Sequence, residues 1–155
     1  MNSQSALALL NSIDKTIKEI DSISGSSTLA DSYFAKFLVV YICGIYEEAV
    51  ESILIDFTKR NTSREEIVRY TEETLDRYFR NPDFYKLVNL VGMFGGKEWK
   101  NELKKLKSGG IALDSIVFNK NSLAHGQLVT TTLADVKQFY MNSRPVIERI
   151  DFLVS

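Results

Sequence analysis

The only histidine of the chain, His125, lies in the segment FNKNSLAHG, residues 118–126. Its imidazole can accept or donate a proton at neutral pH, because the unperturbed pKa of histidine is about 6.5. Asn121 precedes His125 by four positions, so on a helix the two side chains share one face and could share a substrate. Lys120 is offset by about 140° around the helix and reaches the same place only through its long side chain. This combination suits proton transfer by an imidazole beside a cation.

The same residues also permit a purely structural interpretation. Gly126 is typical of the left-handed residue that follows a helix, which places His125 in the last helical turn. A histidine there interacts favourably with the helix dipole and can bond the terminal carbonyl groups. From the residues alone, the chemical and the structural role of His125 both remain open.

A second candidate group lies in the segment GIYEEAV, residues 44–50. Glu47 would orient His125 or Lys120 if the helix that carries it packs against the helix that ends at His125. The alternative is a solvated charge, since Glu47 lies among other glutamates, with Glu48 directly after it.

The pattern of apolar residues predicts an all-α fold. Apolar side chains recur at spacings of three and four along most of the chain, with no sustained two-residue alternation. We expect one domain covering residues 1–155, built around two long core helices with shorter helices beside them. The predicted helices cover residues 3–23, 28–60, 63–79, 83–94, 97–107, 111–125 and 132–154.

Turn and capping residues set the expected boundaries. Pro145 should kink or divide the last helix, because proline lacks the amide that continues a helix. The other expected boundaries are a capping box of Ser63 with Glu66, a stop and restart at Asn81-Pro82-Asp83, breaks at Gly95-Gly96 and Gly109-Gly110, a left-handed Gly126, and a cap at Thr131 or Thr132.

Composition narrows the classes of function. The formal net charge of −1 gives no general attraction for polyanions, which argues against a dedicated nucleic-acid binder and leaves room for an enzyme with a small phosphate site. Cys43 is the only cysteine, so neither an intrachain disulfide nor a zinc site of cysteines and histidines can form. We expect no cofactor and no metal, Cys43 as a small buried apolar residue, no membrane span, no secretory signal and a cytoplasmic location.

The order of these parts resembles the HEPN superfamily, and most closely its RiboL-PSP-HEPN group. A long apolar helix carries Gly44, Tyr46 and Glu47, short helices follow, and KNSLAHG precedes a terminal helix. The characteristic HEPN pattern is an arginine, then a polar residue that is often asparagine, then a histidine. Asn121 and His125 match this pattern, whereas a lysine, Lys120, stands at the usual arginine.

The resemblance implies an all-α HEPN-like bundle and a metal-independent endoribonuclease of a toxin–antitoxin or phage-defence system. Such domains typically form homodimers in which two copies of the motif meet, and an antitoxin or a defence-system protein can be a further partner. RNA is then the substrate, His125 the general acid or base, Lys120 the phosphate-stabilising cation, Asn121 a polar orienting group, and Glu47 their acidic partner. Lysine supplies the charge of arginine without its two-pronged geometry, so we expect weakened activity.

Two alternatives remain. Other HEPN domains have lost activity and bind protein partners as helical modules, in which case Lys120 marks the loss. The third hypothesis is an ordinary helical bundle in which the short motif arose by chance.

Overall fold

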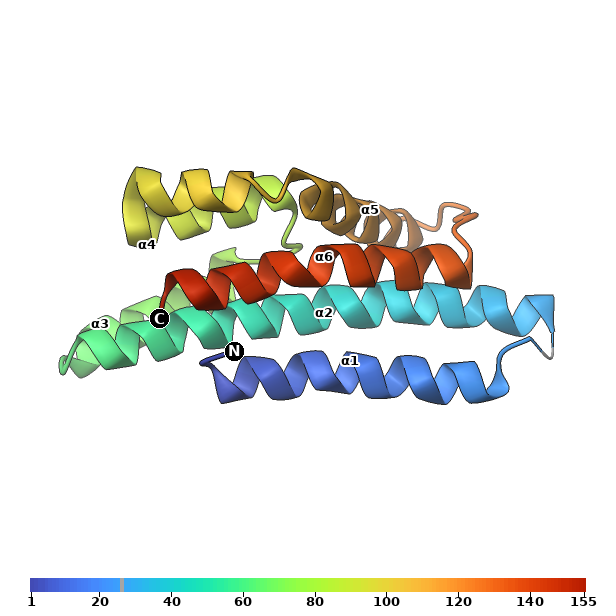
Figure 1. The fold of residues 1–155 in the computed structure, drawn as a ribbon, viewed down its shortest axis with the longest axis horizontal. Coiled ribbons are helices and arrows are strands. Elements are labelled where there is room, and N and C mark those ends of the chain that lie inside the picture. The colour runs from blue at the N-terminus through green and yellow to red at the C-terminus, as the bar shows by residue number, and fades with distance from the viewer. Residues whose placement is uncertain (26) are drawn as a thin grey trace.

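The apolar periodicity of the sequence is realised as six α-helices in the computed structural model, which describes residues 1–25 and 27–155 (Figure 1). The part of the chain that the structure describes contains no β-strand, so the predicted all-α fold is confirmed. The helices are α1 (Gln4–Ile23), α2 (Thr28–Asn61), α3 (Glu65–Tyr78), α4 (Phe84–Lys104), α5 (Lys107–Ala124) and α6 (Leu133–Leu153).

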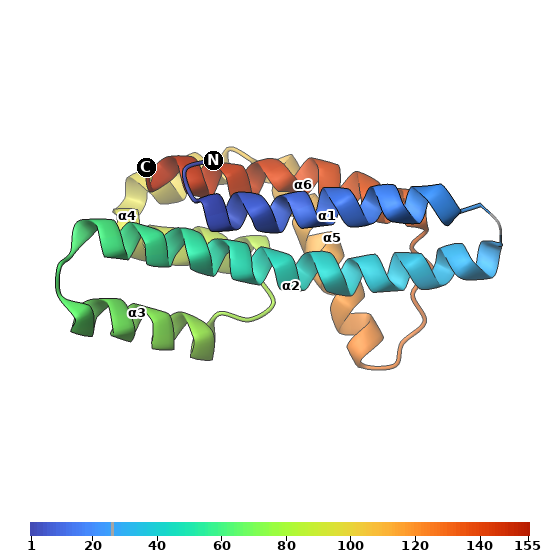
Figure 2. The same ribbon diagram turned by 90° about the horizontal axis from the view of Figure 1, so that it is seen from below.

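Helix α2 forms the centre of the fold. Its 34 residues give it a length of about 50 Å, and it packs against α1, α3, α5 and α6. The buried apolar residues form one core cluster to which all six helices contribute. Seen from below, α3 and the C-terminal end of α5 project on the same side of α2, with the connection from α3 to α4 between them (Figure 2). This arrangement brings segments distant in sequence to one side of α2.

Helix α4 contains the predicted break at Gly96, where φ is +67°. The two arms that meet there correspond to the predicted helices 83–94 and 97–107. Lys100 Nζ of the second arm donates to Asn89 Oδ1 of the first at 2.7 Å. Phe57 of α2 packs edge-on against Trp99 at a ring-centroid distance of 5.5 Å. This contact holds the second arm of α4 against the core.

The predicted break at Gly109-Gly110 is wrong. Both glycines lie in the first turn of α5 and are buried. A Cβ atom on Gly109 would lie 2.8 Å from Val146 Cγ2 and 2.9 Å from the carbonyl oxygen of Asn142, both in α6. A Cβ atom on Gly110 would lie 2.4 Å from the ring of Phe84. These glycines therefore allow close helix packing and do not end a helix.

We expect Gly109→Ala to destabilise the protein by about 1–3 kcal/mol, because the added methyl group collides with a backbone oxygen that cannot move freely. Gly44→Ala is the matched control. Gly44 is an exposed residue inside α2, and nothing lies within 4 Å of its ideal Cβ position. Alanine should stabilise the helix there by about 0.5–1 kcal/mol. Urea unfolding of both variants measures these changes, and equal stability of the two would contradict this role for Gly109.

The predicted capping box at Ser63 is wrong, and of the kink or division expected at Pro145 the division does not occur. Helix α3 begins after Arg64, which makes no side-chain cap, so the Ser63 capping box does not form. The Thr62 hydroxyl accepts the Arg64 amide at 3.1 Å just before the helix, which begins at Glu65, two residues later than predicted. Pro145 does not divide α6. Proline has no amide N–H, so the Met141 carbonyl, four residues earlier, lacks its usual helical hydrogen bond. Met141 and Pro145 are both exposed, so water can bond that carbonyl.

The remaining boundaries agree with the sequence. Asn81-Pro82-Asp83 separates α3 from α4, and Asp83 caps α4 by accepting the Lys86 amide at 2.8 Å. Thr132 caps α6 in a reciprocal capping box with Asp135. Among the described residues, no helix combines the length and the apolar character that crossing a membrane requires.

Candidate functional site

His125 is the residue on which α5 ends. Its amide donates to the Asn121 carbonyl at 3.0 Å, and the next residue, Gly126, has a φ of +68°. The amide of Gln127 then donates back to the Ser122 carbonyl at 2.9 Å. This six-to-one bond completes a Schellman motif, which requires the left-handed residue that the sequence predicted. The backbone of this turn therefore holds His125 at a defined place on the surface.

The imidazole of His125 is exposed. Within residues 1–25 and 27–155, its side chain forms no hydrogen bond and no ion pair, and neither does the half-buried side chain of Asn121. The imidazole therefore does not bond the terminal carbonyl groups of α5. Both side chains are available to a molecule that arrives from solvent.

Lys120 points to the connection between α3 and α4. Its ammonium group donates a hydrogen bond to Asn81 Oδ1. The ammonium group of Lys86 lies beside the same residue and donates to the carbonyl oxygens of Arg80 at 2.9 Å and Asn81 at 3.3 Å. Two lysines from different helices therefore converge on Asn81.

Glu47 reaches the same asparagine from α2. Its Oε1 accepts the Asn81 amide at 2.6 Å, and its Oε2 lies 4.0 Å from Arg80 Nη1. The Glu47 side chain is 17% exposed, so it is not a freely solvated charge. Glu47 is connected to Lys120 through Asn81, and no bond joins it to His125 in the described structure.

The pKa of Cys43 responds to three charged groups of the site, Glu47, Lys120 and Lys86. Cys43 is buried one turn before Glu47. Burial raises the pKa of the Cys43 thiol from 9.0 to about 11; the Glu47 carboxylate adds to the rise, whereas Lys120 and Lys86 oppose it. The thiol is therefore protonated at neutral pH and is not a nucleophile, which agrees with its predicted role as a buried apolar residue.

This raised pKa predicts a pH-dependent contribution to stability. The unfolded thiol loses its proton near pH 9.0 and the folded thiol near pH 11, so the folded state binds the proton more tightly. The contribution is fully present below about pH 9 and is lost as pH rises to about 11. The difference in unfolding free energy between wild type and Cys43→Ala should therefore shift by about 2–3 kcal/mol over this window. Urea unfolding at several pH values measures it, and a difference independent of pH would refute the prediction.

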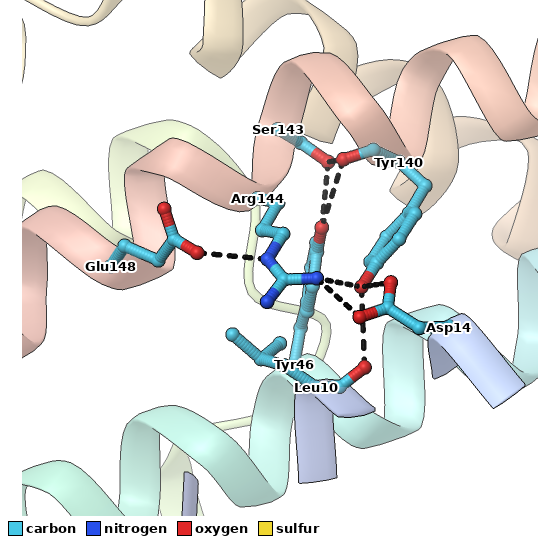
Figure 3. Close-up of polar contacts among 7 residues, drawn as sticks. All are labelled: Leu10, Asp14, Tyr46, Tyr140, Ser143, Arg144 and Glu148. Carbon is cyan, nitrogen blue, oxygen red and sulfur yellow. Dashed lines mark hydrogen bonds and ion pairs between the residues drawn. The ribbon is translucent and has the colours of Figure 1, made fainter. Parts of the chain in front are cut away.

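Tyr46, next to Glu47, belongs to a separate polar cluster that joins α1, α2 and α6 (Figure 3). The Tyr46 hydroxyl lies 2.9 Å from the Ser143 hydroxyl. Tyr140 donates to Asp14 Oδ1 at 2.8 Å, and Arg144 Nη1 donates to Asp14 Oδ2 at 2.6 Å. Burial raises the pKa of Tyr46, so this hydroxyl stays neutral. The cluster fixes three helices to one another, and within the described residues no hydrogen bond or ion pair joins it to the lysines at Asn81.

Three residues at the site were not predicted as site residues: Arg80, Asn81 and Lys86. The sequence marked Asn81 only as a helix stop before proline. A possible signal was present, because asparagine is enriched among non-glycine residues with positive φ, and Asn81 has a φ of +53°. No group of three or more histidine, cysteine or acidic side chains that could hold a metal ion occurs among the residues described.

The chain matches a known protein family. The family model described as RiboL-PSP-HEPN covers residues 2–154 of the chain. The curated proteins and the solved structures contain no match.

Proposed function

The chain belongs to the RiboL-PSP-HEPN group of the HEPN superfamily, and on this basis we propose that it is a metal-independent endoribonuclease of the toxin or phage-defence type, acting in the cytoplasm. The observation that carries the proposal is the exposed imidazole of His125, which is held at the end of α5 without an internal partner among the described residues. Asn121, one turn earlier, would orient the imidazole or the RNA.

The chemistry requires two proton transfers. A base takes the proton of the ribose 2′-hydroxyl, the 2′-oxygen attacks phosphorus, and an acid protonates the departing 5′-oxygen. Each chain has one histidine, so a homodimer that brings two copies together would supply both groups. The charge that develops on the phosphate would be stabilised by Lys120, with Lys86 as a second ammonium group nearby.

An exposed apolar stripe on α2 fits the surface for this homodimer. Leu29, Tyr33, Phe37 and Val40 are 64%, 62%, 51% and 49% exposed. Their spacing of three and four places them on one face of the helix. The same face continues to Glu47, so a second copy docked here would lie next to the candidate site. An exposed apolar patch of this kind commonly marks a contact with another protein.

The alternative function is a helical module that binds an antitoxin or another defence-system protein without cleaving RNA. The observation that favours it is Lys120, which stands in place of the usual arginine and already donates to Asn81. Lys120→Arg distinguishes the two. Faster RNA cleavage by this variant supports the enzyme, whereas no cleavage by either protein supports the module.

The direct test is incubation of the purified protein with single-stranded RNA in the presence of EDTA, with His125→Ala in parallel. We expect cleavage by the wild type that does not need a metal and depends on His125. Equal cleavage by both proteins would rule out the proposed mechanism.

A further inference from the structure

Asn81 has its backbone amide, its backbone carbonyl and its side-chain oxygen engaged at the candidate site. Its amide donates to Glu47 Oε1 at 2.6 Å, its side-chain Oδ1 accepts from Lys120, and its carbonyl accepts from the Asp83 amide at 2.8 Å and from Lys86 Nζ at 3.3 Å. Contacts from α2, α4 and α5 thus meet on one residue of the connection between α3 and α4.

The backbone of Asn81 adopts an uncommon conformation. Its φ of +53° is the only positive value at a non-glycine residue in the described chain. This left-handed conformation is unfavourable for an ordinary residue, although asparagine tolerates it well. Strained backbone persists where its surroundings hold it, and such positions cluster at functional sites. Here the conformation is associated with an amide bonded to Glu47 and a side chain bonded to Lys120.

We propose that Asn81 is a positioning residue that makes Lys120 an effective substitute for arginine. An ammonium group has three N–H donors, which rotate freely on a flexible chain, whereas the donors of a guanidinium group lie in a fixed plane. The bond to Asn81 Oδ1 occupies one donor of Lys120 and fixes the direction of the other two. These two donors can then bind two oxygen atoms of one phosphate.

This inference rests on the proposed function, in which Lys120 binds the scissile phosphate. Asn81 orders the Lys120 ammonium group, which is why a lysine can serve at this position. Glu47 takes part through the backbone, because its bond to the Asn81 amide holds the asparagine in place. The Asn81 side chain is therefore the link that can be removed without disturbing the others.

Asn81→Gly removes this link alone. Glycine accepts a positive φ without strain and keeps the amide for Glu47 and the carbonyl for Lys86. Asn81→Asp is the matched control, since aspartate keeps an oxygen acceptor for Lys120 and also tolerates the left-handed region. Reaction of each lysine with an amine-specific reagent, quantified by mass spectrometry, reports how firmly each ammonium group is held. Urea unfolding checks that both variants fold.

We expect Lys120 to react several-fold faster in Asn81→Gly than in wild type, Lys86 to react at the same rate in both, and Lys120 to stay protected in Asn81→Asp. Cleavage by Asn81→Gly should show kcat lowered by about tenfold or more with a smaller change in KM. Unchanged reactivity of Lys120 in Asn81→Gly would overturn the inference, as would a faster reaction with unchanged kcat. If the wild type cleaves no RNA, the proposed function fails, while the lysine reactivities still decide whether Asn81 holds Lys120.

Discussion

His125→Ala is expected to lower the rate of RNA cleavage by about 10²- to 10⁴-fold, the usual contribution of a general acid or base. The fold should not change, because the imidazole is exposed and forms no hydrogen bond among the described residues. The loss should therefore appear in kcat with an unchanged unfolding curve. Single-turnover cleavage of single-stranded RNA in EDTA, together with urea unfolding of the same samples, measures both quantities.

Gln127→Ala is the control for this experiment. Gln127 is exposed two residues after His125 and takes part in the turn through its backbone amide, which alanine keeps. This variant should cleave RNA like the wild type. The wild-type rate should also pass through a maximum with pH, because one imidazole of the dimer must be neutral while the other is protonated. A rate that rises steadily with pH would argue against two cooperating histidines.

Most of the boundaries that depend on local signals were predicted correctly, although the capping box at Ser63 was not. Gly126 was identified correctly, and Thr132 was one of the two predicted caps, because a left-handed residue and a cap depend on neighbouring backbone groups. Gly109 and Gly110 were misinterpreted because a glycine that ends a helix and a glycine that admits another helix are identical in the sequence. What distinguishes them is the backbone of Asn142 and the ring of Phe84, which come from other helices.

At the candidate site, too, the contacts between different helices could not be predicted from the sequence. Spacing predicted that Asn121 and His125 share a face and that Lys120 needs a long reach. It could not show what Lys120 reaches, because Asn81 lies 39 positions away in the sequence. Glu47 was proposed as an acidic partner of His125 or Lys120. The asparagine that lies between Glu47 and Lys120 was not predicted, since its contact with Glu47 spans 34 positions and uses the Asn81 backbone amide. Contacts made by tertiary packing leave no periodic pattern in the sequence.

Phe37→Glu is expected to weaken self-association by about 100-fold or more. Phe37 lies in the middle of the apolar stripe on α2, and a two-fold axis would introduce the new carboxylate on both sides of the contact. Burying unpaired charges at an interface costs several kcal/mol. Sedimentation should then find a monomer, and cleavage should fall with dimerisation because each monomer has a single imidazole. Met93→Glu is the control, since Met93 is 81% exposed on α4, outside the stripe.

Mixing experiments separate loss of the dimer from loss of the catalytic group. Excess His125→Ala protein added to wild type should form mixed dimers with one imidazole, and activity should fall well below that of the wild type present. The double variant Phe37→Glu with His125→Ala should not inhibit, because it cannot pair. Inhibition by the double variant would place the contact elsewhere on the surface. The absence of inhibition by His125→Ala alone, with the wild type shown to exchange subunits, would mean that one imidazole suffices and that the second proton transfer uses another group.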